Sequence, residues 1–217
     1  MCGWKRARTP EQIDQRRQQI LHAAEELFTS SDYNSVSLNG IARQAGMAKS
    51  NIYNYFQTRE EIFLTLIQNR MLAWGELITR TLERKKLNKI DDLADILISP
   101  EAASEEFLAL TAVLSSSLEQ NSSEESIVKF KRAAMKVSSE LHGIIQTQFP
   151  WFTTQMGGEL FNLLHTLTAG LYYSARPSPA HEQVLTRPEF AAMKINLRES
   201  VSGILKRVLR DMENEVK

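Results

Sequence analysis

Side chains that can pair with nucleic-acid bases and phosphates are concentrated in a short stretch near residue 50. They comprise a cation, a hydroxyl, two amides and an aromatic edge, supplied by Lys49, Ser50, Asn51, Asn54 and Tyr53. Groups of these types read base edges in the major groove and contact phosphate oxygens. The stretch is therefore the first candidate for a functional surface, and its chemistry is that of recognition, not catalysis.

The distribution of charge supports this interpretation. The chain carries 26 Lys and Arg and 26 Asp and Glu, so its zero net charge does not by itself indicate a nucleic-acid partner. From Tyr33 through Arg59, however, the sequence contains no acidic residue. A surface that faces phosphates excludes acids, because like charges there weaken electrostatic complementarity. The position of the charged residues therefore indicates a nucleic-acid partner, although the net charge does not.

Two short segments with helical periodicity would position these side chains. Residues 38–45 and 49–56 each repeat apolar residues at helical spacing, and Gly46 lies between them. Glycine can adopt the positive φ that ends a helix and turns the chain sharply. A helix, a short turn and a second helix form the helix-turn-helix arrangement, whose second helix enters the major groove of DNA.

The surrounding run resembles a known family. Between Ile20 and Ile62 the motifs A-A-x-x-L-F, I-A-x-x-A-G and I-Y-x-Y-F-x-x-[basic]-E-E occur in order. This run is similar to the DNA-binding domain of the TetR family of bacterial repressors. Asp32, Val36 and Ala48 stand where that pattern usually has Gly, Thr and Ser, and none of the three removes the motif. Ala48 lacks a capping oxygen, which weakens the start of the second helix by about 0.5–2 kcal/mol.

The resemblance implies a sequence-specific regulator of transcription that binds double-stranded DNA. The simplest form is a homodimeric repressor released from a palindromic operator by a small, largely apolar ligand. Two alternatives stay open: activation in place of repression, and a DNA-binding protein that is architectural or controlled by a protein partner. We expect base contacts from Asn39, Lys49, Ser50, Asn51 and Asn54. We expect phosphate contacts from Ser37, Tyr53, Tyr55 and Arg59.

The periodicity predicts an all-α protein in two parts. Residues 1–57 form a three-helix DNA-binding domain with a short basic arm, Lys5, Arg6 and Arg8, and residues 58–217 form a helical effector-binding and dimerisation domain. Capping signals start the first helix at Pro10 and a long connecting helix at Arg59. Further helices are expected over residues 91–98, 104–120, 123–148, 153–175 and 188–213, with breaks that include 176–187.

The last two expected helices carry apolar stripes wider than one core face requires. A helix pair with two apolar faces can pack inward and also against a symmetry mate, which gives a four-helix dimer interface. The family resemblance points the same way. The alternative is that both stripes are internal core. The predicted interface residues are Leu160, Leu164, Leu167, Leu171, Val201, Ile204 and Val208.

The middle helices contain aromatic residues with a few polar groups, the composition of an apolar ligand pocket. The same composition is typical of any helical core, so both readings stay open, and a pocket is favoured by the resemblance alone. The sequence identifies no ligand. The candidate lining residues are Trp74, Phe107, Thr111, Phe130, Trp151, Phe161, His165, Thr168 and Tyr172.

Other classes of protein are disfavoured. The four histidines are scattered and form no metal pair or nucleophile–base pair, so we predict no catalytic residue, no metal and no cofactor. Cys2 is the only cysteine, which rules out an internal disulfide. No apolar run approaches the roughly 20 residues of a membrane helix, and we expect a soluble cytoplasmic protein.

Overall fold

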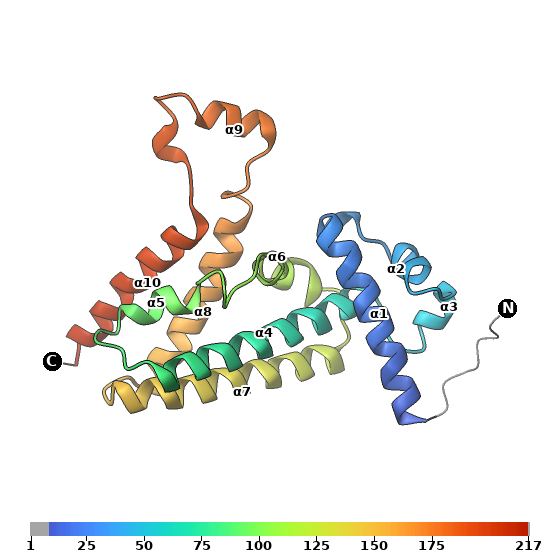
Figure 1. Cartoon of the computed structure of the whole chain (residues 1–217), viewed down its shortest axis with the longest axis horizontal. Helices are drawn as coiled ribbons and strands as arrows, with labels where there is room; N and C mark the ends of the chain where they lie inside the picture. The colour runs from blue at the N-terminus through green and yellow to red at the C-terminus, as the bar shows by residue number, and fades with distance from the viewer. Residues whose placement is uncertain (1–8, 217) are drawn as a thin grey trace.

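The computed structural model describes residues 9–216, and every regular element among them is helical (Figure 1). This confirms the all-α prediction. The predicted basic arm lies outside the described residues. No helix within residues 9–216 is long and apolar enough to cross a membrane. The elements are α1 Pro10–Ser30, η1 Tyr33–Ser35, α2 Leu38–Gln44, α3 Lys49–Ile52, α4 Arg59–Arg84, α5 Asp92–Leu97, α6 Glu105–Val113, η2 Leu114–Leu118, α7 Glu124–Gln148, α8 Thr154–Tyr172, α9 Pro179–Leu185, η3 Ala191–Met193 and α10 Leu197–Asn214.

Local capping groups start the first helix as predicted. The Thr9 side chain accepts from the Gln12 N–H at 3.3 Å, and the Gln12 side chain accepts from the Thr9 N–H at 3.4 Å. Pro10 occupies the first helical position, where its missing N–H is not needed. Along α1, Ile20 and Ala24 are fully buried beneath α2 and α4, whereas Ile13 is 42% exposed and lies outside the core.

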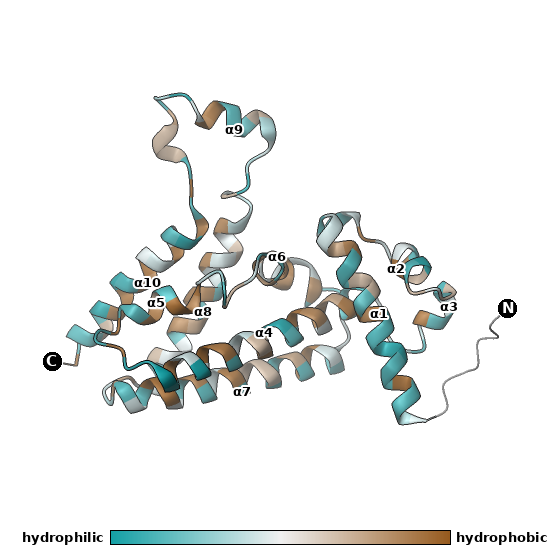
Figure 2. Ribbon diagram, viewed as in Figure 1, coloured by the Kyte–Doolittle hydropathy of each residue, from teal (hydrophilic) through white to brown (hydrophobic). Residues whose placement is uncertain are grey.

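The long helix α4 joins the two parts of the molecule. Figure 1 shows it running from α1 to the far end of the body, with α7 alongside it. The two helices approach closely at Gly75, where a Cβ atom would lie only 2.6 Å from a methyl group of Val137. Figure 2 shows apolar residues concentrated along α4, α6 and α8. The apolar core of the N-terminal helices continues along α4 as far as Ile67, so the boundary at residue 57 stays a prediction.

Two expected helices and one expected break differ from the structure. The helix predicted over 104–120 ends at Val113 and continues as the π-helical turn η2, in which the Glu119 N–H donates to the Leu114 carbonyl at 2.9 Å. The predicted break at 176–187 contains α9, which Ser178 caps. The last helix begins at Leu197, where Asn196 supplies the cap, and not at Pro188. The connection from α8 to α10, which carries α9, projects away from the body (Figure 1).

Candidate nucleic-acid interface

The helix-turn-helix is built on two buried isoleucines. Ile41 of α2 and Ile52 of α3 have no exposed surface, and Gly46 between the helices has φ 64°. That conformation is readily available only to a residue without a side chain. Because α2 and α3 are anchored from beneath, the opposite face of α3 is held out toward solvent. The side chains of Lys49, Ser50 and Asn51 on α3, and those of Tyr53 and Asn54 directly after it, are all exposed.

The recognition helix is shorter than predicted. It ends at Ile52, and the chain then makes tighter turns, with the Tyr55 N–H donating to the Ile52 carbonyl at 2.8 Å. Arg17 of α1 holds this end in place, because it donates to the Tyr55 carbonyl at 2.6 Å and lies over the Phe56 ring. As predicted, Ala48 supplies no side-chain cap at the start of α3.

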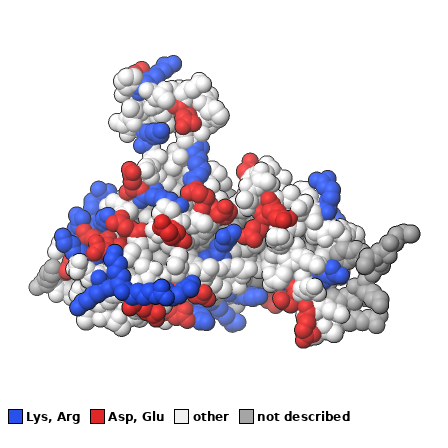
Figure 3. Space-filling model, viewed as in Figure 1, with Lys and Arg blue, Asp and Glu red and all other residues white. Residues whose placement is uncertain are grey.

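The two residues expected to contact DNA ahead of α3 are also accessible. Ser37 and Asn39 are exposed at the start of α2. The Ser37 hydroxyl accepts from the Gly40 N–H at 3.1 Å, which caps α2 and leaves its own proton for another acceptor. Tyr55 is only partly exposed. Seven of the nine residues predicted to contact DNA are therefore exposed. Over the larger body, charged side chains of both signs are intermingled (Figure 3).

Arg59 lies differently from the expectation of a phosphate contact. Its guanidinium donates to the carbonyls of Val36 at 2.8 Å and Tyr33 at 3.3 Å, and pairs with Glu60 at 2.8 Å. It also lies over the Tyr33 ring, 4.4 Å from the centroid. The side chain is only 21% exposed. Arg59 therefore fixes the segment between α1 and α2 to the start of α4. The sequence could not show this, because the two carbonyls that it binds lie more than twenty residues away.

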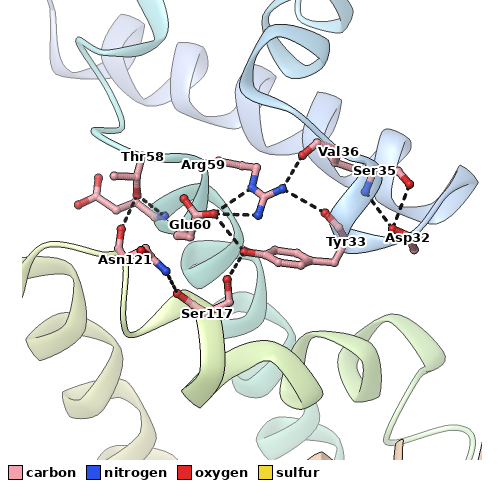
Figure 4. Close-up of polar contacts among 10 residues, drawn as sticks. Asp32, Tyr33, Ser35, Val36, Thr58, Arg59, Glu60, Ser117 and Asn121 are labelled. Atoms are coloured by element: carbon pink, nitrogen blue, oxygen red, sulfur yellow. Dashed lines mark hydrogen bonds and ion pairs between the residues drawn. The ribbon is translucent and has the colours of Figure 1, made fainter. Parts of the chain in front are cut away.

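A polar joint connects the helix-turn-helix to the body (Figure 4). The Tyr33 hydroxyl donates to Glu60 at 3.2 Å and shares a hydrogen bond with Ser117 of η2 at 2.8 Å. The Thr58 hydroxyl donates to the Asn121 carbonyl at 2.9 Å. These contacts span 27 to 84 residues of sequence, so the joint belongs to the tertiary fold.

Glu61 is the buried centre of this joint. Its carboxylate accepts from the Gln57 N–H at 2.7 Å, the Ser123 N–H at 3.1 Å and the Ser126 hydroxyl at 3.2 Å, and it also accepts from the Ser123 hydroxyl. Burial raises the pKa of Glu61, but the hydrogen bonds from Ser123, Gln57 and Ser126 outweigh it and lower the pKa overall. The residue is 5% exposed, so it holds an ionised carboxylate between the starts of α4 and α7.

The aromatic residues proposed as a pocket lie in different places. The ring centroids of Phe107 and Phe161 lie 6.1 Å and 6.2 Å from that of Trp74. The indole N–H of Trp74 donates to the Leu97 carbonyl at 2.9 Å. Phe130, by contrast, belongs to the core shared with the N-terminal helices, and Trp151 packs near Phe152. The aromatic set is thus divided between two cores, and a pocket that contains all of it stays a prediction.

The polar members of that set are also separated. Thr111 donates to the Phe107 carbonyl of its own helix at 2.8 Å, and Thr168 is 2% exposed. His165 hydrogen bonds with Ser115 of η2 at 3.1 Å, and burial lowers the pKa of its ring. Tyr172 lies instead on a cleft of about 270 Å³ between α1 and η1 on one side and α6 and the end of α8 on the other. Sequence reasoning missed this cleft, because its walls come from three distant segments.

Two predicted dimer residues are internal. Leu160 and Val201 have no exposed surface in the single chain, because they face each other's helices in the packing of α8 against α10. They cannot form an outer surface, and this part of the prediction is wrong. The remaining five are partly exposed on the same two helices: Leu164, Leu167, Leu171, Ile204 and Val208.

Known proteins match both parts of the chain. A model of the tetR family of bacterial regulatory proteins matches residues 20–66, and one of the tetracyclin repressor-like C-terminal domain matches residues 69–214. A helix-turn-helix transcriptional regulator of Mycobacterium tuberculosis (strain H37Rv) is 35% identical over 92 residues, 42% of this chain and 40% of that protein. The fatty acid metabolism regulator protein of Bacillus subtilis is 32% identical over 71 residues, 33% of this chain and 37% of that protein. The chain thus spans less than half the length of these relatives.

Among solved structures, the TetR-family repressor FadR of Thermus thermophilus, in complex with lauroyl-CoA, is similar with a TM-score of 0.60. The similarity covers 91% of this chain and 93% of that one at 16% sequence identity, which shows a shared fold. A helix-turn-helix carried by a helical body, with an acid-free exposed face, defines a DNA-binding regulator of transcription. The chain belongs to the TetR family of bacterial regulatory proteins, as its N-terminal motifs predicted.

Proposed function

We propose that the protein is a homodimeric repressor that binds a palindromic operator through α2 and α3. The observation that carries this proposal is the exposed, acid-free face of α3 on a rigidly buried base. We assign base edges to Asn39, Lys49, Ser50, Asn51 and Asn54, and phosphates to Ser37, Tyr53 and Tyr55. Arg59 is reassigned from phosphate contact to positioning of the helix-turn-helix, because its donors are bound internally.

The partly exposed residues of α8 and α10 support the dimer. Leu164, Leu167 and Leu171 recur at helical spacing on α8, and Ile204 and Val208 lie on the adjacent α10. Two such helices from each protomer would bury an apolar surface that one protomer leaves half open. A two-fold dimer places one α3 in each half-site, so the operator should be palindromic with half-sites on one face of the duplex.

Selection of bound genomic fragments, followed by footprinting, tests this proposal. We expect a palindromic or near-palindromic site protected over two half-sites. An asymmetric site with a single half-site bound at full affinity would contradict the two-fold dimer.

The polar joint supports release of the operator by a small, largely apolar ligand. From His165 on α8, hydrogen bonds lead to Ser115, and from Ser117 in the same π-helical turn to Tyr33. Short π-helical segments are frequent at functional sites. A ligand that moves α8 would shift η2 and, through Tyr33, the spacing of the two helix-turn-helix units. A ligand releases DNA only if it binds the DNA-incompetent arrangement more tightly.

The Tyr33→Phe variant tests this route by removing the hydroxyl and keeping the ring. Lauroyl-CoA, which the similar Thermus thermophilus structure contains, heads a screen of acyl-CoAs and fatty acids for ligands of the full chain. For a ligand that binds, its affinity is measured with and without operator. We expect operator to weaken ligand binding by about 5–150-fold in the wild type and by less in Tyr33→Phe. Equal affinities in the wild type would contradict the switch.

A further inference from the structure

The cleft between the two parts of the molecule has a distinctive chemistry. Phe28 and Asp32 form its N-terminal wall. The opposite wall carries two acids, Glu105 and Glu106, and two adjacent tyrosines. Figure 3 shows acidic side chains on both sides of this junction, over α6 and over the nearby end of α1. With a volume of about 270 Å³, it falls below the roughly 300–1,000 Å³ of pockets for drug-sized ligands, so its occupant must be small.

Two of the three carboxylates in the cleft form no direct ion pair within residues 9–216. Glu105 is paired with two cations, Arg176 and Arg198, which more than balance its charge. Asp32 and Glu106 take part in none of the ion pairs found within residues 9–216. A hydrogen bond from the Ser35 N–H lowers the pKa of Asp32. The pKa of Glu106 is lowered first by a hydrogen bond from its own N–H, and the nearby Arg70 cation lowers it further. Both are therefore charged at neutral pH, and the charged residues that line the cleft are three carboxylates and one cation, Arg176.

The aromatic wall already holds one cation. The rings of Tyr172 and Tyr173 are 5.2 Å apart and perpendicular, at an interplanar angle of 89°. The guanidinium of Arg176 lies over the Tyr172 ring, 3.9 Å from its centroid. Tyr173, in contrast, is 54% exposed and carries no such partner among the cation–ring contacts of residues 9–216. Burial raises the pKa of Tyr173, and the nearby Asp32 carboxylate adds to the shift.

We propose that this cleft binds a small organic cation of the alkylammonium class, held by the carboxylates of Asp32 and Glu106 and the ring of Tyr173. Aromatic faces attract organic cations through the ring quadrupole, by a factor of roughly 2–30 in affinity for one contact. A divalent metal ion is disfavoured, because no group of three His, Cys, Asp or Glu within residues 9–216 could hold one. Asp32 belongs to the helix-turn-helix side and Tyr173 to the body, so the ligand would contact both.

Calorimetric titration of the full chain with choline chloride tests the site, with 3,3-dimethylbutan-1-ol as the neutral compound of the same shape. We expect saturable binding of choline and at least about tenfold weaker binding of the alcohol, because only choline has a charge for the carboxylates and the ring. Equal binding of the two compounds, or no binding of either choline or tetramethylammonium, overturns the proposal.

Conservative variants test the individual residues. Glu106→Gln and Asp32→Asn keep the shape of the side chain and should each weaken choline binding at least threefold, while Glu76→Gln, an exposed glutamate of α4 outside the cleft, should leave it unchanged. Tyr173→Phe keeps the ring and should bind like the wild type, whereas Tyr173→Leu should bind roughly 2–5-fold more weakly. Thermal unfolding of each variant verifies the fold. Binding that is unaffected by both Glu106→Gln and Asp32→Asn overturns the site.

The binding proposal does not depend on the repressor function. A regulatory role of the site does rest on the repressor function. In that role, bound choline would fix the helix-turn-helix relative to the body and so change the affinity for the operator. If choline binds with the expected variant pattern but operator affinity does not change, the site stands and its regulatory role fails. If no operator is found at all, the repressor function fails while the calorimetric result still decides the site.

Discussion

The two hydrophobic cores of this protein differ in how their buried residues relate to function. In the N-terminal core, the buried residues Ile41 and Ile52 support a separate set of exposed polar side chains on α3. In the larger core, Trp74 and Phe161 are themselves the residues that a ligand pocket would use. Recognition on a surface is therefore visible in the pattern of the sequence. The residues that line an interior ligand pocket are of the same types as those of an ordinary apolar core, so the sequence pattern does not distinguish the two.

The largest effect on operator affinity should come from a charge in the proposed dimer interface on α8 and α10. Leu167→Glu places a charge in the proposed dimer interface, where an unpaired buried charge costs several kcal/mol. We expect monomers, and operator affinity should fall about 100-fold or more because the second half-site is lost. Light scattering gives the mass and titration of operator DNA gives the affinity.

Val128→Glu is the matched control, since Val128 is 38% exposed on α7. It should leave both mass and affinity unchanged. A well-folded Leu167→Glu dimer of normal mass would show that the interface lies elsewhere.

A smaller effect is expected at the joint between the two cores. Glu61→Gln removes a carboxylate that accepts four hydrogen bonds, so it should lower the free energy of unfolding by about 1–3 kcal/mol at neutral pH. Because the pKa of Glu61 is lowered in the folded state, its contribution is complete above the ordinary glutamate pKa of about 4.3 and is lost as pH falls through the folded pKa.

Denaturant unfolding at a series of pH values measures this contribution. The difference between wild type and Glu61→Gln should therefore shrink on acidification. A difference that stays constant down to about pH 3 would mean that the carboxylate charge is not what holds α4 to α7.

The turn of the helix-turn-helix should give the smallest change in stability. Gly46→Ala forces a side chain into the left-handed region and should cost about 1–2 kcal/mol. Gly143→Ala on α7, where an added Cβ would meet nothing within 4 Å, should be neutral or slightly stabilising. Thermal unfolding compares the two. Equal effects would show that the conformation at Gly46 is not the reason for the glycine.

The sequence predicted elements whose signals are local and missed contacts made across the fold. Thr9 and Thr58 cap the helices that they were expected to start, because a cap and its target lie three residues apart. The same type of signal occurs at Ser178, with a proline after it, and starts α9 inside the segment predicted to be a break. The internal hydrogen bonds of Arg59 could not be predicted, because the Val36 carbonyl that it binds is brought near only by the tertiary fold.

The dimer and pocket predictions show the same limit. Leu160 and Leu164 lie on one helix at one-turn spacing, yet Leu160 is fully buried and Leu164 is partly exposed. Periodicity shows that a helix has a wide apolar stripe, but it does not show which part of the stripe a neighbouring helix covers. The π-helical turn at Leu114–Leu118 is equally invisible to a helical pattern, although it supplies the contacts to Tyr33 and His165.

The most direct test of the account is selection of bound DNA fragments by three proteins: the wild type, Lys49→Ala and Arg59→Ala. If α3 reads bases and Arg59 only supports it, Lys49→Ala should change the preferred bases. Arg59→Ala should lower stability and affinity for all sequences alike, without changing the salt dependence that phosphate contacts produce. A changed base preference in Arg59→Ala together with an unchanged one in Lys49→Ala would contradict the assignment of the interface.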